Sequence, residues 1–484
     1  MDFINVLASP PHFFRLFFQL AFSLFYAALS ERRKASLKRP SSADYELDAT
    51  TGPFPREPLQ NLPPYYTIWE DAFHTATHPD TRLRLGIDNR AESVGAHIHG
   101  SQWRADVASW PVLDTECLQG NVRFLQRAHY VLAWLVNLYV HSLPPPSDAP
   151  SSNDAPIIIP KSLAVPLAAV SRQLRIAPVL TFADTVLWNW EFVDATKPLS
   201  ETNMKFRTFS GTRDEEQFYL ASATAELHGI EMLRIIDDYH NLPNVTDLTT
   251  ISKVARDLGR LKGVIEDISA IIQSVRAKCE PHVFYWQVRP WFEGHNPSGA
   301  SWVYEGVPDS HKLDLNGPSA GQSTVMHAVD LFLDIDHKLR QRRRYPAPSS
   351  ENRRAEKGFM ERMRRYMPGK HRDYLLALSN TPHPVRDLAA QIPTLRDPYD
   401  GAVDALKNLR SAHIRIACLY VVSMTNSTSF WSRCPIAGQV KKEITHARGT
   451  GGNEVTVLLK AGRDATYRAM FKPPPEKYLA PPKH

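Results

Sequence analysis

The sequence predicts an all-α protein with two domains, a large helical domain in the C-terminal half and a smaller, mostly helical N-terminal domain. From about Glu215 onward, apolar residues recur at the three- and four-residue spacing of amphipathic helices. The chain has 484 residues, 43% of them hydrophobic, which is enough for two ordinary globular cores. It contains no internal repeat of solenoid period, so a repeat architecture is not expected.

The predicted elements follow the chain in order. Residues 1–40 form an N-terminal extension, and a small domain over residues 43–207 begins with a proline-containing linker. Its clearest helical pattern runs from Val122 to Leu143, before a proline- and serine-rich stretch whose composition predicts a surface loop. The large domain covers residues 208–470, followed by a tail of residues 471–484. Its predicted helices are Gln217 to Ile236, Asp247 to Lys278, Thr324 to Arg344, Arg353 to Arg365 and Ala402 to Met424.

Charge and cysteine usage limit the classes of partner. The chain carries 57 Lys and Arg against 51 Asp and Glu, and most of this excess lies in the first forty residues. No basic face interleaved with aromatic residues is present, so no nucleic-acid partner is expected. The four cysteines are far apart and form no Cys-x-x-Cys pair, which argues against a disulfide framework and a cysteine zinc site. These features favour a reducing compartment, and we expect a cytoplasmic monomer.

The N-terminal extension has its own pattern. Residues 13–30 are rich in Phe and Leu, but polar residues recur every three or four positions, and the apolar run from Leu16 to Leu29 is too short to span a membrane. The pattern therefore predicts an interfacial amphipathic helix, and the basic residues after it would attract anionic lipid, giving peripheral membrane contact through residues 13–39. The alternatives are a helix that packs on its own globule and a wrongly assigned gene start.

His413 is the most informative single residue. It lies in the last predicted helix, and the residues three, four or seven positions away are apolar, namely Leu406, Leu409, Ile416, Ala417 and Tyr420. A helix with this spacing projects the imidazole from its buried face, where the side chain needs a partner. One interpretation is a core histidine hydrogen-bonded to a carbonyl group. The other is a metal or haem ligand, since neutral imidazole on an apolar wall is a common haem ligand.

Short sequence motifs around His413 distinguish the two interpretations. Met363-Arg-Arg-Tyr-Met-Pro368 with His371-Arg372, then Leu409-Arg-Ser-Ala-His413, then Arg448-Gly-Thr-Gly-Gly452 occur in an order and spacing that resembles the indoleamine 2,3-dioxygenases. The resemblance runs from about residue 43 to about residue 465 and excludes residues 1–40. The upstream words that agree are Asp44-Tyr45, Pro58 to Tyr66, Ala164-Val-Pro166, Phe182-Ala-Asp184, Trp188-Asn-Trp190, Val303 to Gly306 and Ser319 to Ser323.

The resemblance implies a haem enzyme and assigns roles to individual residues. His413 would be the proximal ligand of the iron of haem b, and Asp330 with Arg410 would lie near the haem propionates. Phe218 and Ser222 would face the indole and the iron, and Phe284 would pack on the substrate. Arg289 would bind the substrate carboxylate, for which a forked guanidinium is well shaped. The remaining substrate-binding positions are Ser319 and Ala320 in a loop on the distal side, and Gly449, Thr450 and Gly451 in a mobile lid.

Two departures from the family pattern concern the substrate. Pro318 stands where glycine is common, and Glu293 stands where a small residue is common, in a tract one residue shorter than usual. The expected activity is the opening of the indole ring of L-tryptophan, or of a related indoleamine, by dioxygen to give N-formylkynurenine, the first step of the kynurenine pathway. The alternatives are a related haem enzyme that oxidises a different indole or amine in secondary metabolism, and a non-catalytic haem-binding protein.

Overall fold

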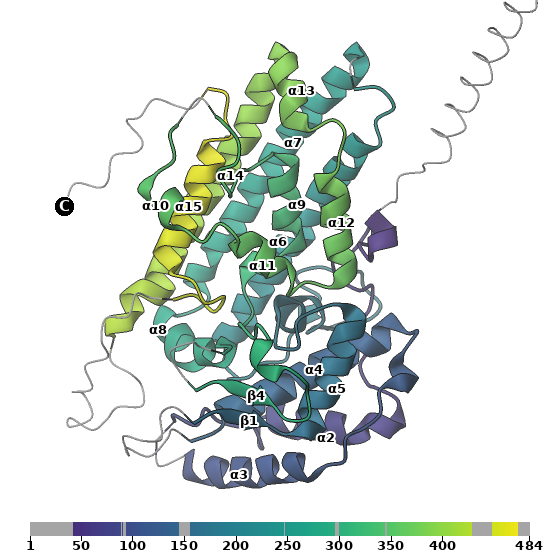
Figure 1. Ribbon diagram of the computed structural model, residues 1–484, viewed down its shortest axis with the longest axis vertical. Helices are drawn as coiled ribbons and strands as arrows, with labels where there is room; N and C mark the ends of the chain where they lie inside the picture. The colour runs from purple at the N-terminus through teal and green to yellow at the C-terminus, as the bar shows by residue number, and fades with distance from the viewer. Residues whose placement is uncertain are drawn as a thin grey trace, which may run out of the picture.

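The computed structural model describes residues 42–88, 90, 93–144, 155–245, 247–295, 300–343, 346–427 and 448–472. The fold is all-α, as predicted: Figure 1 shows a tall bundle of helices standing on a smaller part that is also mainly helical. The predicted N-terminal amphipathic segment, most of the predicted loop at residues 143–156 and nearly all of the C-terminal tail lie outside the described residues. Within the described residues, no helix has the length and apolarity needed to cross a membrane.

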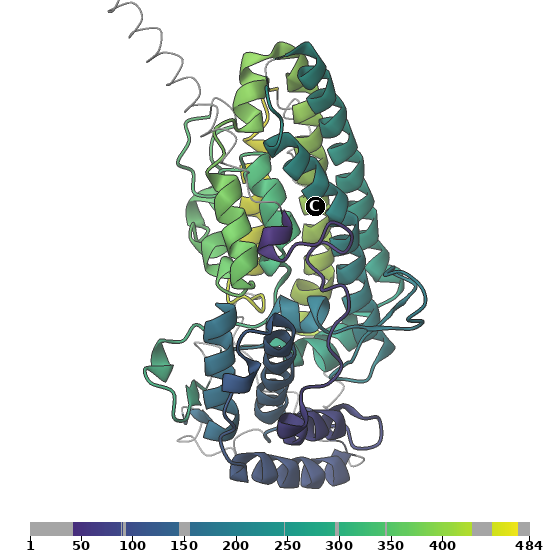
Figure 2. The ribbon, with the colours of Figure 1, turned by 90° about the vertical axis from the view of Figure 1, so that its right-hand side faces the viewer.

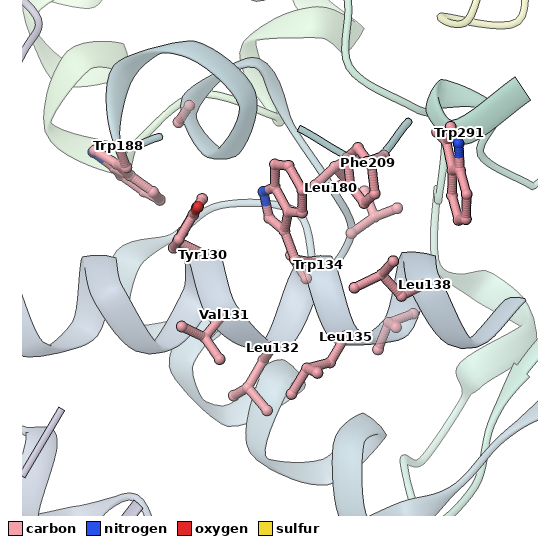
Figure 3. Close-up of a cluster of buried hydrophobic side chains, with 14 of the residues drawn as sticks. Tyr130, Val131, Leu132, Trp134, Leu135, Leu138, Leu180, Trp188, Phe209 and Trp291 are labelled. Carbon is pink, nitrogen blue, oxygen red and sulfur yellow. The ribbon is translucent and has the colours of Figure 1, made fainter. Parts of the chain in front are cut away.

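The smaller part is built around the buried helix α4 (Val122–His141). Its other helices are α2 (Thr67–Thr77), α3 (Val94–Ser109) and α5 (Lys161–Leu174). Helix α4 begins where the Asn121 side chain accepts hydrogen bonds from two backbone N–H groups of the first turn. Trp134 of α4 stacks on Phe209 with ring centroids 3.6 Å apart, and Phe209 stacks in turn on Trp291 (Figure 3). This aromatic column joins α4 to segments that are distant in the sequence.

Two short sheets tie the smaller part together. Strand β1 (Ile157–Ile159) pairs in parallel with β4 (Trp302–Tyr304), and β2 (Glu191–Phe192) pairs antiparallel with β3 (Met204–Lys205). The β1–β4 pair places residues 302–304 beside the smaller part, although they follow α6 and α7 of the bundle in the sequence (Figure 1). The division of the chain after residue 207 stays a prediction.

Three long helices form the bundle: α6 (Arg213–His240), α7 (Leu248–Ser274) and α14 (Arg396–Ala417). Helices α6 and α7 begin at N-caps, where Thr212 and Asp247 accept backbone N–H groups. Figure 2 shows the bundle from the side. An apolar core, separate from the one around α4, fills the interior of the bundle. The shorter helices of this part are α8 (Pro281–Val283), α9 (Thr324–Phe332), α10 (Ser350–Arg354), α11 (Phe359–Arg364), α12 (Gly369–Ser379), α13 (Val385–Gln391) and α15 (Val455–Tyr467).

Two predicted helices are wrong in their extent. The helix expected over Thr324 to Arg344 ends at Phe332, because Asp334 and Leu339 adopt left-handed backbone conformations. The Asp336 carboxylate accepts hydrogen bonds from the backbone N–H groups of residues 340 and 341, and these bonds stabilise a loop in place of the helix. The helix expected over Arg353 to Arg365 is instead the two short helices α10 and α11.

Candidate functional site

A single cavity of about 410 Å³ is lined by all the residues to which the resemblance assigns a catalytic, substrate-binding or haem-binding role. Its walls come from α6, α14 and α15 of the bundle, from residues 318–321 and 449–451, and from residues 182–186 of the smaller part. Most of the lining side chains are apolar, with a few polar groups. The predicted residues on its walls are Phe218, Ser222, Phe284, Arg289, Ser319, Ala320, Asp330, Arg410, His413, Gly449, Thr450 and Gly451.

His413 lies in the cavity wall on α14. Leu409, Ile416, Ala417 and Tyr420 line the same cavity, as their spacing from His413 predicts, while Leu406 packs into the core of the bundle. The imidazole makes no hydrogen bond to another described residue, so a carbonyl-bound core histidine is not what the structure shows. Burial lowers its pKa, and the nearby Arg410 lowers it further. The side chain is therefore neutral at pH 7, the form that binds a metal ion.

Arg410 and Asp330 form a buried ion pair one helical turn from His413. The guanidinium donates to both carboxylate oxygens of Asp330, with N–O distances of 2.5 and 2.7 Å, and also to Thr466 on α15. His337 Nε2 lies 2.7 Å from the same carboxylate. Burial alone would raise the pKa of Asp330, but Arg410 and His337 hold it well below its usual range. The cavity thus has one anchored cationic group beside the candidate ligand.

An aromatic wall faces the predicted substrate space. The rings of Phe218 on α6 and Phe284 have centroids 4.8 Å apart, and Phe292 and Tyr420 contact this pair from two sides. Ser222, one turn after Phe218, lines the same cavity and donates its hydroxyl to the Phe218 carbonyl oxygen. This arrangement can hold a flat apolar ring and exclude water from it.

Glu226 continues this face of α6 by one more turn. It is fully buried; Ser323, the N-cap of α9, donates its hydroxyl to Glu226 Oε1. The other carboxylate oxygen has no hydrogen-bond partner among the described residues. Burial raises the pKa of Glu226 to about 7, against the opposing effect of Ser323. Much of this carboxyl group is therefore protonated at neutral pH.

Arg289 has partners that the sequence did not predict. Its Nη1 donates to Glu293 Oε1 at 2.8 Å, and its Nη2 donates to the backbone carbonyl oxygen of Arg448 at 2.7 Å. The guanidinium lies over the ring of Tyr285, 5.5 Å from its centroid. The nearby Trp291 belongs to the aromatic column with Phe209. Arg289 therefore both lines the cavity and forms a salt bridge.

The two glycine-containing loops contact each other over the cavity. Gly317 N–H donates to the Thr450 carbonyl oxygen, and the Thr450 hydroxyl donates to the Pro318 carbonyl oxygen at 2.5 Å. A Cβ atom at Gly317 would lie 1.9 Å from the Phe292 carbonyl oxygen, so only glycine allows this close approach. Pro318 is accommodated because its carbonyl oxygen, and not an N–H group, makes the contact.

Sequence reasoning missed several parts of the cavity. His337 falls in a predicted helix that the structure does not form. Phe182 belongs to a family-like motif without an assigned role, and Thr185 and Val186 lie outside the predicted motifs. Three π-helical turns supply parts of the wall, Ala183–Leu187, Phe284–Val288 and Cys418–Val422. Such turns often occur at functional sites. The last of them carries Tyr420 beyond the end of α14, inside the longer helix that the sequence predicts.

A second hollow of about 220 Å³ lies in the smaller part and is more polar. Its cationic groups are largely engaged by the protein itself. Arg127 forms a two-pronged pair with Glu70, Lys205 pairs with Glu191, and Arg82 donates to the carbonyl oxygens of residues 208 and 209. These contacts give the hollow a structural explanation, and the larger cavity remains the candidate site.

The larger cavity fits a haem group. It offers an apolar space, a neutral imidazole with no hydrogen-bond partner among the described residues, and an anchored guanidinium for an anionic substituent. Within the described residues, no group of three or more His, Cys, Asp or Glu side chains could hold a metal ion by itself.

Comparison with known proteins identifies the family of this chain. A sequence model of the family described as "Indoleamine 2,3-dioxygenase" matches residues 41–469. The chain is 28% identical to indoleamine 2,3-dioxygenase 1 of Rattus norvegicus over 441 residues, 89% of this chain and 96% of that protein. It is 27% identical to the indoleamine 2,3-dioxygenase of Saccharomyces cerevisiae, covering 84% of this chain and 93% of that protein. It is also 27% identical to a 6-hydroxytryptophan 2,3-dioxygenase of Fusarium equiseti, covering 87% and 95%. The chain therefore belongs to the indoleamine 2,3-dioxygenase family and is a dioxygenase acting on tryptophan or a related indole.

Proposed function

We propose that this protein binds haem b through His413 and opens the indole ring of L-tryptophan with dioxygen, giving N-formylkynurenine and so starting the kynurenine pathway. The observation that carries this proposal is the convergence of His413, Arg289 and the Phe218–Phe284 wall on one apolar cavity. The reaction breaks the bond between indole carbons C2 and C3, and each carbon takes one oxygen atom of dioxygen. No electrons are consumed overall.

The bound haem would supply the dioxygen chemistry, and the protein would supply orientation and exclusion of water. His413 would hold the iron, and Arg410, fixed by Asp330, would receive a propionate. The Phe218 and Phe284 rings would hold the indole, while Arg289 would bind the carboxylate of an amino-acid substrate. The Ser222 hydroxyl donates to the Phe218 carbonyl oxygen, and this small side chain would leave room in the cavity for the substrate.

A second candidate substrate is a substituted tryptophan or another indole amine in secondary metabolism. Two observations favour it: the similarity to a 6-hydroxytryptophan 2,3-dioxygenase, and the carboxylate of Glu293 beside Arg289. A non-catalytic haem protein does not agree with the family assignment, which makes the chain a dioxygenase.

The test is identification of the product. Full-length protein loaded with haem b is incubated with a reductant, ¹⁸O-labelled dioxygen and either L-tryptophan, 6-hydroxytryptophan or tryptamine. We expect mass spectrometry to show a ring-opened product that contains both labelled oxygen atoms, with L-tryptophan turned over fastest. Faster turnover of 6-hydroxytryptophan or tryptamine would establish the second candidate. Stoichiometric haem binding without consumption of any of the three indoles would refute the proposal.

A further inference from the structure

The carboxylate-binding arginine of the site already holds a carboxylate of this chain. Arg289 Nη1 donates to Glu293 Oε1 at 2.8 Å, and the two residues are four positions apart. We infer that Glu293 is a specificity-determining residue: it competes with a substrate carboxylate for Arg289 and attracts a substrate ammonium group. This inference rests on the proposed function, since it assigns the substrate class to the same cavity.

The two side chains differ in exposure. The Arg289 side chain is 15% exposed and lines the cavity, whereas the Glu293 side chain is 48% exposed and does not line it. The guanidinium is held from other directions by the Arg448 carbonyl oxygen and by the Tyr285 ring. Among these partners, only Glu293 brings a charge. A ligand carboxylate that approaches Arg289 therefore meets a guanidinium that Glu293 already neutralises.

The backbone of Glu293 is fixed, although its side chain is exposed. Its carbonyl oxygen lies 2.8 Å from His141 Nε2 of α4. The next residue, Gly294, packs so closely on residues 315–317 that a Cβ atom there would lie 2.2 Å from the Leu315 carbonyl oxygen. Glu293 thus stays beside Arg289, and only its side chain can move away when a ligand carboxylate arrives.

The strength of the pair indicates the size of the effect. Exposed ion pairs contribute up to about 1 kcal/mol, and a contribution of about 0.4–1 kcal/mol means that displacing Glu293 lowers the affinity for a carboxylate about two- to fivefold. An ammonium group near Arg289 experiences the opposite effect, since Glu293 compensates the repulsion between two cations. Glu293 therefore raises the affinity for indole amines and lowers the affinity for indole acids, and it changes the affinity for L-tryptophan, which carries both groups, least.

The test measures equilibrium dissociation constants of haem-loaded, full-length protein by titration calorimetry. Three probes differ only in their charged groups: indole-3-propionate, tryptamine and L-tryptophan. The variants are Glu293→Gln, which removes the charge and keeps the size, and Glu293→Gln in the Arg289→Ala background. Glu266→Gln is the matched control, because Glu266 forms an exposed pair with Lys262 four positions away on α7, outside the cavity.

We expect Glu293→Gln to tighten indole-3-propionate about two- to fivefold, to weaken tryptamine by a similar factor, and to change L-tryptophan least. The control variant should change none of them, and without Arg289 the gain for indole-3-propionate should vanish. An equal change for all three probes, or none, would overturn the inference while leaving the proposed function intact. Failure of all three indoles to bind the unsubstituted protein would refute the proposed function, and the inference with it.

Discussion

The Asp330–Arg410 pair allows a sharp test of how the site is built. In the Asp330→Ala variant, Arg410 keeps its position on α14 but loses both charge-assisted hydrogen bonds to the carboxylate. The side chains are 6% and 13% exposed, and Arg410 then keeps only neutral partners, the Gly462 carbonyl oxygen and the Thr466 hydroxyl, among the described residues. Leaving a buried charge unpaired in this way costs about 3–5 kcal/mol. We expect this loss in the free energy of unfolding, measured by urea denaturation followed by circular dichroism.

Two further variants separate stability from cofactor binding. Glu266→Ala, which removes an exposed pair on α7, should cost less than about 1 kcal/mol. Replacing both partners with apolar residues, Asp330→Leu with Arg410→Met, should recover much of the stability, because no charge is then left unpaired. This double variant should still bind haem more weakly than the unsubstituted protein, because it lacks the Arg410 guanidinium that would receive a propionate. A cost below about 1 kcal/mol for Asp330→Ala would refute the buried-pair reasoning.

Three other predictions follow from the structure. The His413→Ala variant should lose haem, whereas the exposed control His383→Ala should retain it; an unchanged Soret band in the first variant would exclude His413 as the ligand. The pKa of Glu226 is raised to about 7, so between about pH 4.5 and pH 7 this carboxyl group is protonated in the folded state and ionised in the unfolded state. The free energy of unfolding should therefore fall by about 1.4 kcal/mol for each unit of rising pH in this range. Urea unfolding at several pH values should show a flatter profile for Glu226→Gln. Deleting residues 1–40 should release the protein from anionic vesicles in a low-salt sedimentation assay and leave haem content unchanged; full-length protein that does not sediment with vesicles would exclude the membrane role.

The apolar periodicity around His413 determined the orientation of that residue without the structure. Helical neighbours three and four positions apart share a face whatever the rest of the chain does, so Leu409, Ile416 and Tyr420 were placed correctly beside it. The family-like motifs likewise identified, from the sequence, twelve residues that the structure brings together on the cavity wall. Such information is local or carried by ordered motifs, and it can be read from the chain alone.

Tertiary packing decided the ends of elements and the partners of charged groups. Helix α9 stops at Phe332 because Asp334 turns left-handed and Asp336 binds later backbone N–H groups, which no apolar periodicity records. The cavity wall from residues 182–186 exists because the smaller part packs against the bundle.

Arg289 shows the same limit most clearly. Its pairing with Glu293 is within reach of helical spacing, but its contacts with Arg448 and with the tyrosine beneath it depend on side-chain directions in a turn region. The sequence alone determined which residues are available to the site. The long-range contacts determined which of them are free to meet a substrate, because hydrogen-bond geometry is set only when distant segments are brought together.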